Sequence, residues 1–160
     1  MSELLIRPAE ERDYDAVVKI AVSQWEKIYE VYKEILGEEI YALHFPNHLA
    51  MKAEAIRADL DSGRVFVTEC EGKVAGFLHY NYDPDMKIGE ISDNAVSGEF
   101  RGRGIGPRQY EYILGLFREW GAVGATVHTG LDDGHAPARR AYEKVGFKVG
   151  LPTINYFMKL

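Results

Sequence analysis

The sequence predicts an α/β fold in which a mixed central sheet, antiparallel in its first strands and parallel at its last pair, is flanked by helices. Three observations support this. Apolar residues recur at helical spacing up to about residue 60, and from residue 64 the period changes to that of strands. A glycine-rich loop at 102–106 then joins a strand to a helix that is followed by another strand. Such a crossover brings the two strands together in parallel.

The chain begins with a short strand candidate at 4–6, which Arg7-Pro8 should stop. A helix follows over 11–25 and continues to Gly37, a typical stop. Its apolar positions have the three-and-four spacing of an amphipathic helix: Tyr14, Val17, Val18, Ala21, Val22, Trp25, Ile28, Tyr29, Tyr32, Ile35 and Leu36. We expect its aromatic residues to form core, with the alternative that one or two of them wall a substrate pocket.

A further helix is predicted through Leu60, with Asn47 as its cap and a stop at residues 61–63. Its inward positions should be Leu49, Ala53, Ile56 and Leu60. His44 and His48 have the spacing of metal-binding helices, but Pro46 lies between them and no third ligand completes a set, so we expect no metal site.

Three antiparallel strands should come next. Residues 64–70 and 74–82 form a hairpin around a tight turn at 71–73, and residues 83–85 turn the chain into a strand over 87–96. After the glycine loop we expect a helix over 105–120, a parallel strand over 122–129, a helix over 135–145 and a last strand over 147–158, interrupted by Pro152. There is no internal repeat, and residues 1–160 are interpreted as one domain.

Composition narrows the class of protein. The chain has 160 residues, 46% apolar, with a net charge of −6, which argues against a nucleic-acid partner. It shows neither a signal-peptide pattern nor a run long enough to cross a membrane, and the single Cys70 suits a reducing compartment, so we expect a cytoplasmic protein. Basic residues gather beside the glycine loop and acidic ones in the first half. An anionic ligand on the later half and a cationic one facing the earlier half would fit this asymmetry.

The glycine loop lies within VSGEFRGRGIGPR at 96–108. Glycines allow close backbone approach to a ligand, and the free N–H groups of the next helix's first turn, which Pro107 suits, attract anions. With arginines at 101, 103 and 108, the stretch is interpreted as a site for a ligand with at least two phosphates. It matches neither GxGxxG nor a Walker loop, and taken alone an ordinary strand-to-helix turn remains the alternative.

Two motifs resemble those of the GNAT superfamily of acyl-CoA-dependent N-acetyltransferases. RGRGIG at 101–106, five residues after Val96, is similar to the family's [RQ]xxGx[GA], and HAPARRAYEKVGF at 135–147 is similar to its second motif, Nxx(A)xxxY followed by xxxGF. With the order of elements, the resemblance spans nearly the whole chain. It implies a GNAT fold and an acetyl-CoA co-substrate, with no metal.

Carried over by position, the resemblance implies that backbone amides of 103–108, Pro107 excepted, bind the pyrophosphate of coenzyme A. Main-chain groups of 94–96 would pair with its pantetheine arm and polarise the acetyl carbonyl, as a strand edge can. The cofactor-binding residues expected are Asn94, Ala95, Val96, Arg101, Gly102, Arg103, Gly104, Ile105, Gly106, Arg108, His135 and Ala138.

Two catalytic roles are implied in the same way. Tyr142 stands where the family commonly keeps a general acid for the departing thiolate, and Glu90 where several members carry a strand glutamate that deprotonates the amine through water. A core tyrosine and an exposed carboxylate are the alternatives. Regular alternation would put Glu90, Ser92 and Asn94 on one face of their strand, whereas a bulge would break that parity for Asn94.

Two residues depart from the family pattern. His135 replaces the usual asparagine, which leaves open whether it contacts coenzyme A, and Gly98 replaces a frequent proline.

The resemblance implies direct transfer of an acetyl group from acetyl-CoA to a primary amine of a small molecule or peptide. A relay through Cys70 is not expected, because no histidine is close to it in the sequence. A non-catalytic acyl-CoA sensor and transfer of a longer acyl group are the alternatives. A homodimer built on the last strand is common in the family and stays open here.

Overall fold

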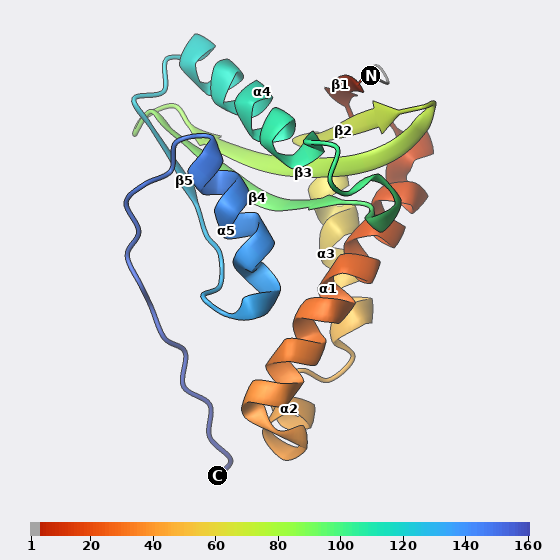
Figure 1. Ribbon diagram of the computed structural model, residues 1–160, viewed down its shortest axis with the longest axis vertical. Coiled ribbons are helices and arrows are strands. Elements are labelled where there is room, and N and C mark those ends of the chain that lie inside the picture. Colours follow the sequence, from red (N-terminus) through yellow and green to blue (C-terminus); the bar gives the residue numbers. More distant parts are fainter. Residues whose placement is uncertain (1–3) are drawn as a thin grey trace.

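The computed structural model describes residues 4–160, which form one five-stranded sheet in the order β1-β2-β3-β4-β5 (Figure 1). Neighbouring strands pair antiparallel as far as β4, and β5 pairs with β4 in parallel, which confirms the mixed sheet. The strands are β1 (Leu4–Pro8), β2 (Val65–Cys70), β3 (Lys73–Asp83), β4 (Ile88–Val96) and β5 (Gly124–Val127). Pairing continues through Pro8, because an edge strand tolerates a proline at its end.

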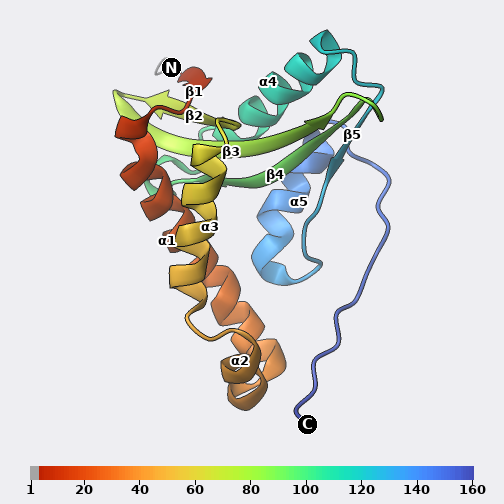
Figure 2. The ribbon, with the colours of Figure 1, turned by 180° about the vertical axis from the view of Figure 1, so that it is seen from behind.

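Helices cover both faces of the sheet (Figures 1 and 2). α1 (Tyr14–Leu36) and α3 (His48–Asp61) lie on one face, and α4 (Ile105–Glu119) and α5 (Ala136–Lys144) lie on the other, whereas α2 (Glu38–His44) lies away from the sheet at the far end of α1 (Figures 1 and 2). Three short 3₁₀ turns, η1 (Glu11–Asp13), η2 (Gly98–Phe100) and η3 (Asp133–His135), precede α1, the glycine loop and α5. Gly37 ends α1 as predicted, at φ +75°.

The predicted cap of α3 is correct in position but not in its interaction. Asn47 is the N-cap residue, but its φ of +54° is left-handed and its side chain makes no capping hydrogen bond. Ile56 and Leu60 face inward and are buried, as predicted, while Leu49 and Ala53 are only half-buried.

Alternation along β3 divides the core between the two faces. Phe77 packs with the apolar side chains of α1 and α3, whereas Leu78 packs with those of α4 and α5. Both are about 1% exposed, so the sheet is covered on both sides in its middle.

β4 contains a bulge that decides where its polar residues point. Leu78 pairs with Asn94 but Tyr80 pairs with Ile91, so two residues of β4 stand opposite one of β3. Asn94 therefore shares the α4/α5 face with Ile91, and Glu90 lies on the α1/α3 face. The regular alternation that would have kept Glu90 and Asn94 together does not occur, and the open alternative of a bulge does.

The predicted last strand over 147–158 is wrong. No residue after α5 belongs to a strand, and the segment runs away from the sheet toward α2 (Figures 1 and 2). A strand needs a partner ladder, and this segment instead meets side chains near α2, where the Met158 carbonyl lies 3.3 Å from His44 Nε2. Pro152 within it also lacks the N–H that a ladder uses. Among residues 4–160, no helix is long and apolar enough to span a bilayer.

Candidate active site

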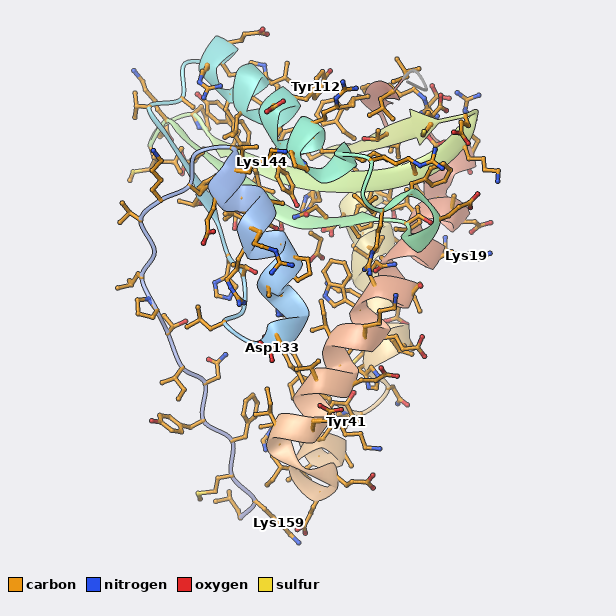
Figure 3. All side chains as sticks on the ribbon, viewed as in Figure 1. Lys19, Tyr41, Tyr112, Asp133, Lys144 and Lys159 are labelled. Atoms are coloured by element: carbon orange, nitrogen blue, oxygen red, sulfur yellow. The ribbon has the colours of Figure 1, made fainter. Side chains whose placement is uncertain are left out.

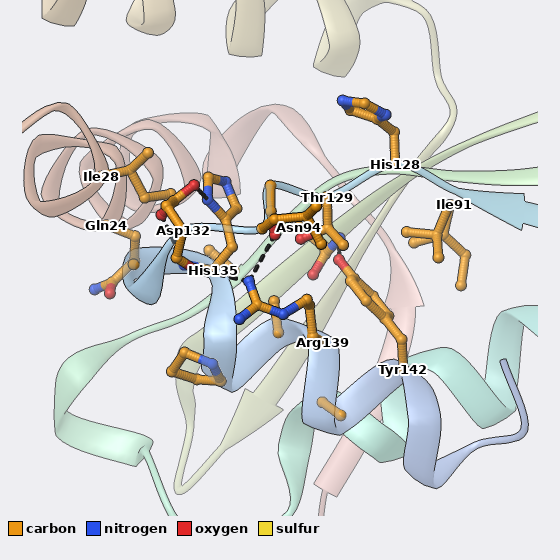
Figure 4. A pocket seen from close by; sticks show the side chains of 18 of the residues that line it. Gln24, Ile28, Ile91, Asn94, His128, Thr129, Asp132, His135, Arg139 and Tyr142 are labelled. Atoms are coloured by element: carbon orange, nitrogen blue, oxygen red, sulfur yellow. Dashed lines mark hydrogen bonds and ion pairs between the residues drawn. The ribbon is translucent and has the colours of Figure 1, made fainter. Parts of the chain in front are cut away.

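A cleft of about 1930 Å³ opens between α1, the end of β4, the N-terminus of α4 and α5 (Figure 4). Most of the predicted site residues line it: Glu90, Asn94, Ala95, Val96, Arg101, Gly102, Gly104, Ile105, Gly106, His135, Ala138 and Tyr142. Arg103 and Arg108 do not, so the structure brings all but these two to one cavity.

The glycine loop presents unused amides to this cleft. Gly102 and Gly104 have φ of +76° and +74°, the left-handed region that glycine adopts without strain, and α4 begins directly after them. Within residues 4–160, no hydrogen bond is formed by the backbone amides of 102–106. The Arg108 amide differs, because it already donates to the Gly104 carbonyl at 3.3 Å. The run of unused loop amides therefore ends at residue 106.

Of the three arginines, only Arg101 reaches the cleft. Its guanidinium donates to the side chain of Gln24 on α1, which is 8% exposed. Arg103 turns to Glu71, with Nη1 to Oε1 at 2.6 Å, and lies over the ring of Phe100. Its side chain thus ties the loop to the β2–β3 turn, a role that the sequence did not suggest.

Asn94 joins two buried tyrosines on the α4/α5 face. The Tyr110 hydroxyl donates to Asn94 Oδ1 at 2.7 Å, and Asn94 Nδ2 donates to the Tyr142 hydroxyl at 2.9 Å and to the Ser92 carbonyl at 2.8 Å. Burial raises the pKa of Tyr142, although its hydrogen bonds with Asn94 and Tyr110 act in the opposite direction. Both phenols therefore remain protonated near neutrality; the Tyr110 hydroxyl donates to Asn94, and the Tyr142 hydroxyl accepts from it.

Glu90 lines the cleft from the other face of β4. Its side chain is exposed, and Asn81 on β3 donates to its Oε2 at 3.0 Å. Because of the bulge, Glu90 and Tyr142 approach the cleft from opposite faces of the sheet.

The loop between β5 and α5 holds a polar pair that the sequence did not reveal. Asp132 Oδ2 lies 2.7 Å from His135 Nδ1, and Arg139 Nη1 donates to the carbonyls of Gly130 and Asp132, both at 2.7 Å (Figure 4). Asp132 is the N-cap residue of η3, and its side chain accepts from the His135 N–H three residues later. Aspartate is a common N-cap residue, and that pattern could have identified Asp132 in the sequence.

Aromatic side chains contribute to the wall on the α1 side. Trp25, Tyr32, Phe45 and Phe157 line the cleft, which agrees with the alternative that some α1 aromatics wall a pocket. Tyr29 packs instead against the ring of His48, 4.4 Å between centroids. Among residues 4–160, no three His, Cys, Asp or Glu side chains are grouped so that they could hold a metal ion.

The fold and the cleft define an α/β protein in which a helix N-terminus with unused amides lies beside the end of a sheet strand. Residues 25–147 match the model of the Acetyltransferase (GNAT) family, and the chain belongs to that family. It is an acetyltransferase, and its mixed sheet is the GNAT fold.

Three similar proteins share less than a quarter of their residues with this chain. The chain is 24% identical over 151 residues, 93% of its length and 85% of the relative's, to the L-amino acid N-acetyltransferase AaaT of Escherichia coli (strain K12). Its fold is similar to that of the PaiA N-acetyltransferase of Thermoplasma acidophilum in complex with coenzyme A, with a TM-score of 0.73, 15% identity and 97% and 96% of the two chains covered. It is also similar to the aminoglycoside acetyltransferase meta-AAC0020 from an uncultured soil metagenomic sample, in complex with sisomicin, with a TM-score of 0.57, 16% identity and 98% and 96% covered.

Proposed function

We propose that this acetyltransferase moves an acetyl group directly from acetyl-CoA to a primary amine of a small molecule or peptide. The observation that carries the proposal is the set of unused amides at 102–106, placed at the N-terminus of α4 and at the rim of the cleft. A diphosphate fits there, because a Cβ added at Gly102 or Gly104 would meet no atom within 4 Å. The similar Thermoplasma protein was crystallised with coenzyme A, and the other two similar proteins are named as an L-amino acid N-acetyltransferase and an aminoglycoside acetyltransferase. These names agree with the proposal.

The end of β4 suits the pantetheine arm. β5 pairs with β4 only from Ile88 to Ile91, so beyond Ile91 that edge of β4 has no strand partner within residues 4–160. An unpaired edge offers N–H and C=O groups in a row to the two amides of pantetheine. An N–H group fixed at 94–96 would also stabilise the oxyanion that forms as the amine attacks; loss of one such donor typically costs about 3 kcal/mol.

Side chains of the cleft supply the proton transfers. The Tyr142 hydroxyl accepts from Asn94, which leaves its own hydrogen available to the departing thiolate. Glu90, exposed on the opposite wall, is the candidate base that the family resemblance implies. Direct transfer fits because Cys70 is fully buried and does not line the cleft.

The deciding experiment is to incubate the protein with acetyl-CoA and a panel of primary amines, and to follow free thiol. We expect release that depends on both substrates. Coenzyme A binding without release for any amine would instead favour an acyl-CoA sensor, and a stronger thermal shift with longer acyl-CoAs would favour another donor.

A separate experiment tests whether the glycine loop at 102–106, called the cradle below, binds the diphosphate. Gly104→Val should lower coenzyme A affinity at least 100-fold, because a branched side chain at φ +74° is strained and stands where the phosphates approach. Titration calorimetry measures this, with the melting temperature as a check on folding. Unchanged affinity would place the nucleotide elsewhere.

A further inference from the structure

Asp132 and His135 form a rigid pair at the start of α5. Oδ1 of Asp132 accepts the backbone N–H of His135 at 3.2 Å, while Oδ2 lies 2.7 Å from Nδ1 of its ring. The side chains are only 12% and 17% exposed, respectively. Since one carboxylate holds both the backbone and the ring of His135, the imidazole has a fixed orientation.

The surrounding residues keep this pair in place. A Cβ on Gly130 would come within 2.4 Å of Asp132 Oδ2 and 2.6 Å of His135 Nδ1, so the pair packs directly on glycine backbone. Arg139 holds the loop by its two carbonyls, and Tyr32 of α1 stacks on the imidazole with 6.2 Å between centroids. A loop residue that served only as surface would need none of these supports.

The hydrogen bond to Asp132 fixes the tautomer. A carboxylate accepts, so Nδ1 carries the hydrogen of the neutral ring, and Nε2 keeps its lone pair. Nε2 forms no hydrogen bond with any atom of residues 4–160, and His135 lines the cleft (Figure 4). The ring thus presents a basic nitrogen to the substrate cavity.

His135 is the N-cap residue of α5, and Tyr142 lies within that helix. Residues seven apart return to the same side of an α-helix about 10 Å further along it, and both line the cleft with Ala138 between them. One end of that face carries a proton acceptor and the other a proton donor. This arrangement suits a reaction in which a nitrogen loses a proton and a sulfur gains one.

We propose that His135 is the catalytic base that deprotonates the acceptor ammonium, directly or through one water, and that Asp132 is its positioning residue. This rests on the proposed function. Nε2 takes one proton from R–NH₃⁺, and the free amine forms the C–N bond. As the C–S bond breaks, Tyr142 gives its hydroxyl proton to the departing thiolate, and the second proton lost by the nitrogen reprotonates Tyr142 through water. His135 returns its proton to solvent.

Two groups could be the base that deprotonates the acceptor ammonium: the Asp132–His135 pair, called the dyad below, and Glu90. An alkylammonium has a pKa near 10, so at pH 7 only about one molecule in a thousand is free amine. An imidazole, with an ordinary value near 6.5, accepts a proton near neutrality more readily than a carboxylate does. Glu90 is exposed, and one of its carboxylate oxygens accepts a hydrogen bond from Asn81. The imidazole of the dyad is already held in position by Asp132. Glu90 then contributes negative charge that attracts the ammonium.

The first test reads the ring without any turnover. In ¹⁵N-edited NMR spectra of the whole protein near pH 8, His135 should be the Nδ1–H tautomer, and Asp132→Asn should reduce the population of that tautomer. Asp133→Asn is the matched control, because Asp133 is the exposed neighbouring carboxylate and does not line the cleft (Figure 3). A wild-type ring protonated at Nε2 would overturn the proposal.

The second test uses thiol release. His135→Gln should lower kcat/KM at least 100-fold and change its pH dependence, while coenzyme A affinity and the melting temperature change little. Asp132→Asn should lower kcat/KM by a smaller factor and also change its pH dependence. Asp133→Asn should do neither. Full activity in His135→Gln, or a loss that lies wholly in coenzyme A affinity, would overturn the role of the dyad alone. A wild type inactive with every amine would instead contradict the proposed function, and the dyad's role with it.

Discussion

The two faces of the sheet hold their polar groups in different ways. On the α4/α5 face, neutral hydrogen bonds join Asn94 to two buried tyrosines. On the α1/α3 face the polar residues are ionisable: Lys52 Nζ lies 2.8 Å from Asp93 Oδ2, and His79 Nδ1 lies 3.4 Å from Asp59 Oδ1. Asp93 and Asn94 are neighbours in β4, so their side chains point to opposite faces of the sheet.

This difference has a chemical reason. Uncharged donors on the α4/α5 face are fixed without introducing a net charge, which suits a face where negative charge develops on oxygen and sulfur. Carboxylates on the α1/α3 face suit the approach of a cationic amine. Each of the following predictions tests whether the faces differ as described, from the largest expected effect to the smallest.

On the α4/α5 face, the backbone of Gly89 packs closely against Phe117. A Cβ there would lie 2.3 Å from the ring of Phe117, so Gly89→Ala should lower the free energy of unfolding by about 3 kcal/mol. Gly115→Ala is the control, because its Cβ would meet nothing within 4 Å and alanine favours a helix, which predicts stabilisation of up to about 1 kcal/mol. Urea unfolding measures both. If Gly89→Ala is tolerated, this face is looser than the distances indicate.

Removal of the amide that links the tyrosines comes next. Asn94→Ala should destabilise the protein by about 2 kcal/mol, because the hydroxyls of Tyr110 and Tyr142 lose their partner in a buried setting. Asn81→Ala removes a comparable hydrogen bond from an exposed position and should change stability by less than about 0.5 kcal/mol. Equal effects in urea unfolding would mean that the buried network has no special weight.

Tyr142→Phe removes one hydroxyl and leaves the ring. We expect a loss of about 1 kcal/mol in stability, since Asn94 Nδ2 keeps its bond to the Ser92 carbonyl, and a fall of about 100-fold in kcat with little change in coenzyme A affinity. Tyr112→Phe, on the half-exposed side of α4, is the control for a lost phenol (Figure 3). A full-speed Tyr142→Phe enzyme would remove the residue from the mechanism.

The sequence predicted the parts of this comparison that depend on local patterns. Period-two alternation located β2 to β4, and the glycine in the turn at 71–73 made the hairpin recognisable. In the structure both Glu71 and Gly72 have positive φ. The glycine spacing located the cradle. The bulge at residues 92 and 93 could not be seen, because one extra residue leaves no mark in the pattern of β4.

Contacts between distant segments were also out of reach. Lys52 and Asp93, or Arg103 and Glu71, are brought together only by the fold, and no local rule pairs them. The segment after α5 misled because alternation shows which residues suit a strand, not whether a partner edge is available.

The smallest expected effect is a pH dependence on the α1/α3 face. His79 is 6% exposed, and burial lowers its pKa below the ordinary 6.5, although Asp59 opposes the shift. Asp93 and Glu90 also favour the protonated ring, and Arg64 disfavours it. Neither ring nitrogen is hydrogen-bonded within residues 4–160, so the nearby carboxylates offset only part of the loss of solvation when the ring becomes charged.

The sign follows from proton counting. As the pH falls below 6.5, the unfolded chain takes up a proton at residue 79 before the folded protein does, so the free energy of unfolding falls. Asp59 works against this at lower pH, because burial raises its pKa and the folded state then gains a proton first. Between pH 7.5 and 6, urea unfolding should show wild type losing more stability than His79→Gln, by less than about 1 kcal/mol. Equal losses would mean that His79 charges as easily in the fold as in water, and the α1/α3 face would then tolerate charge even in its core.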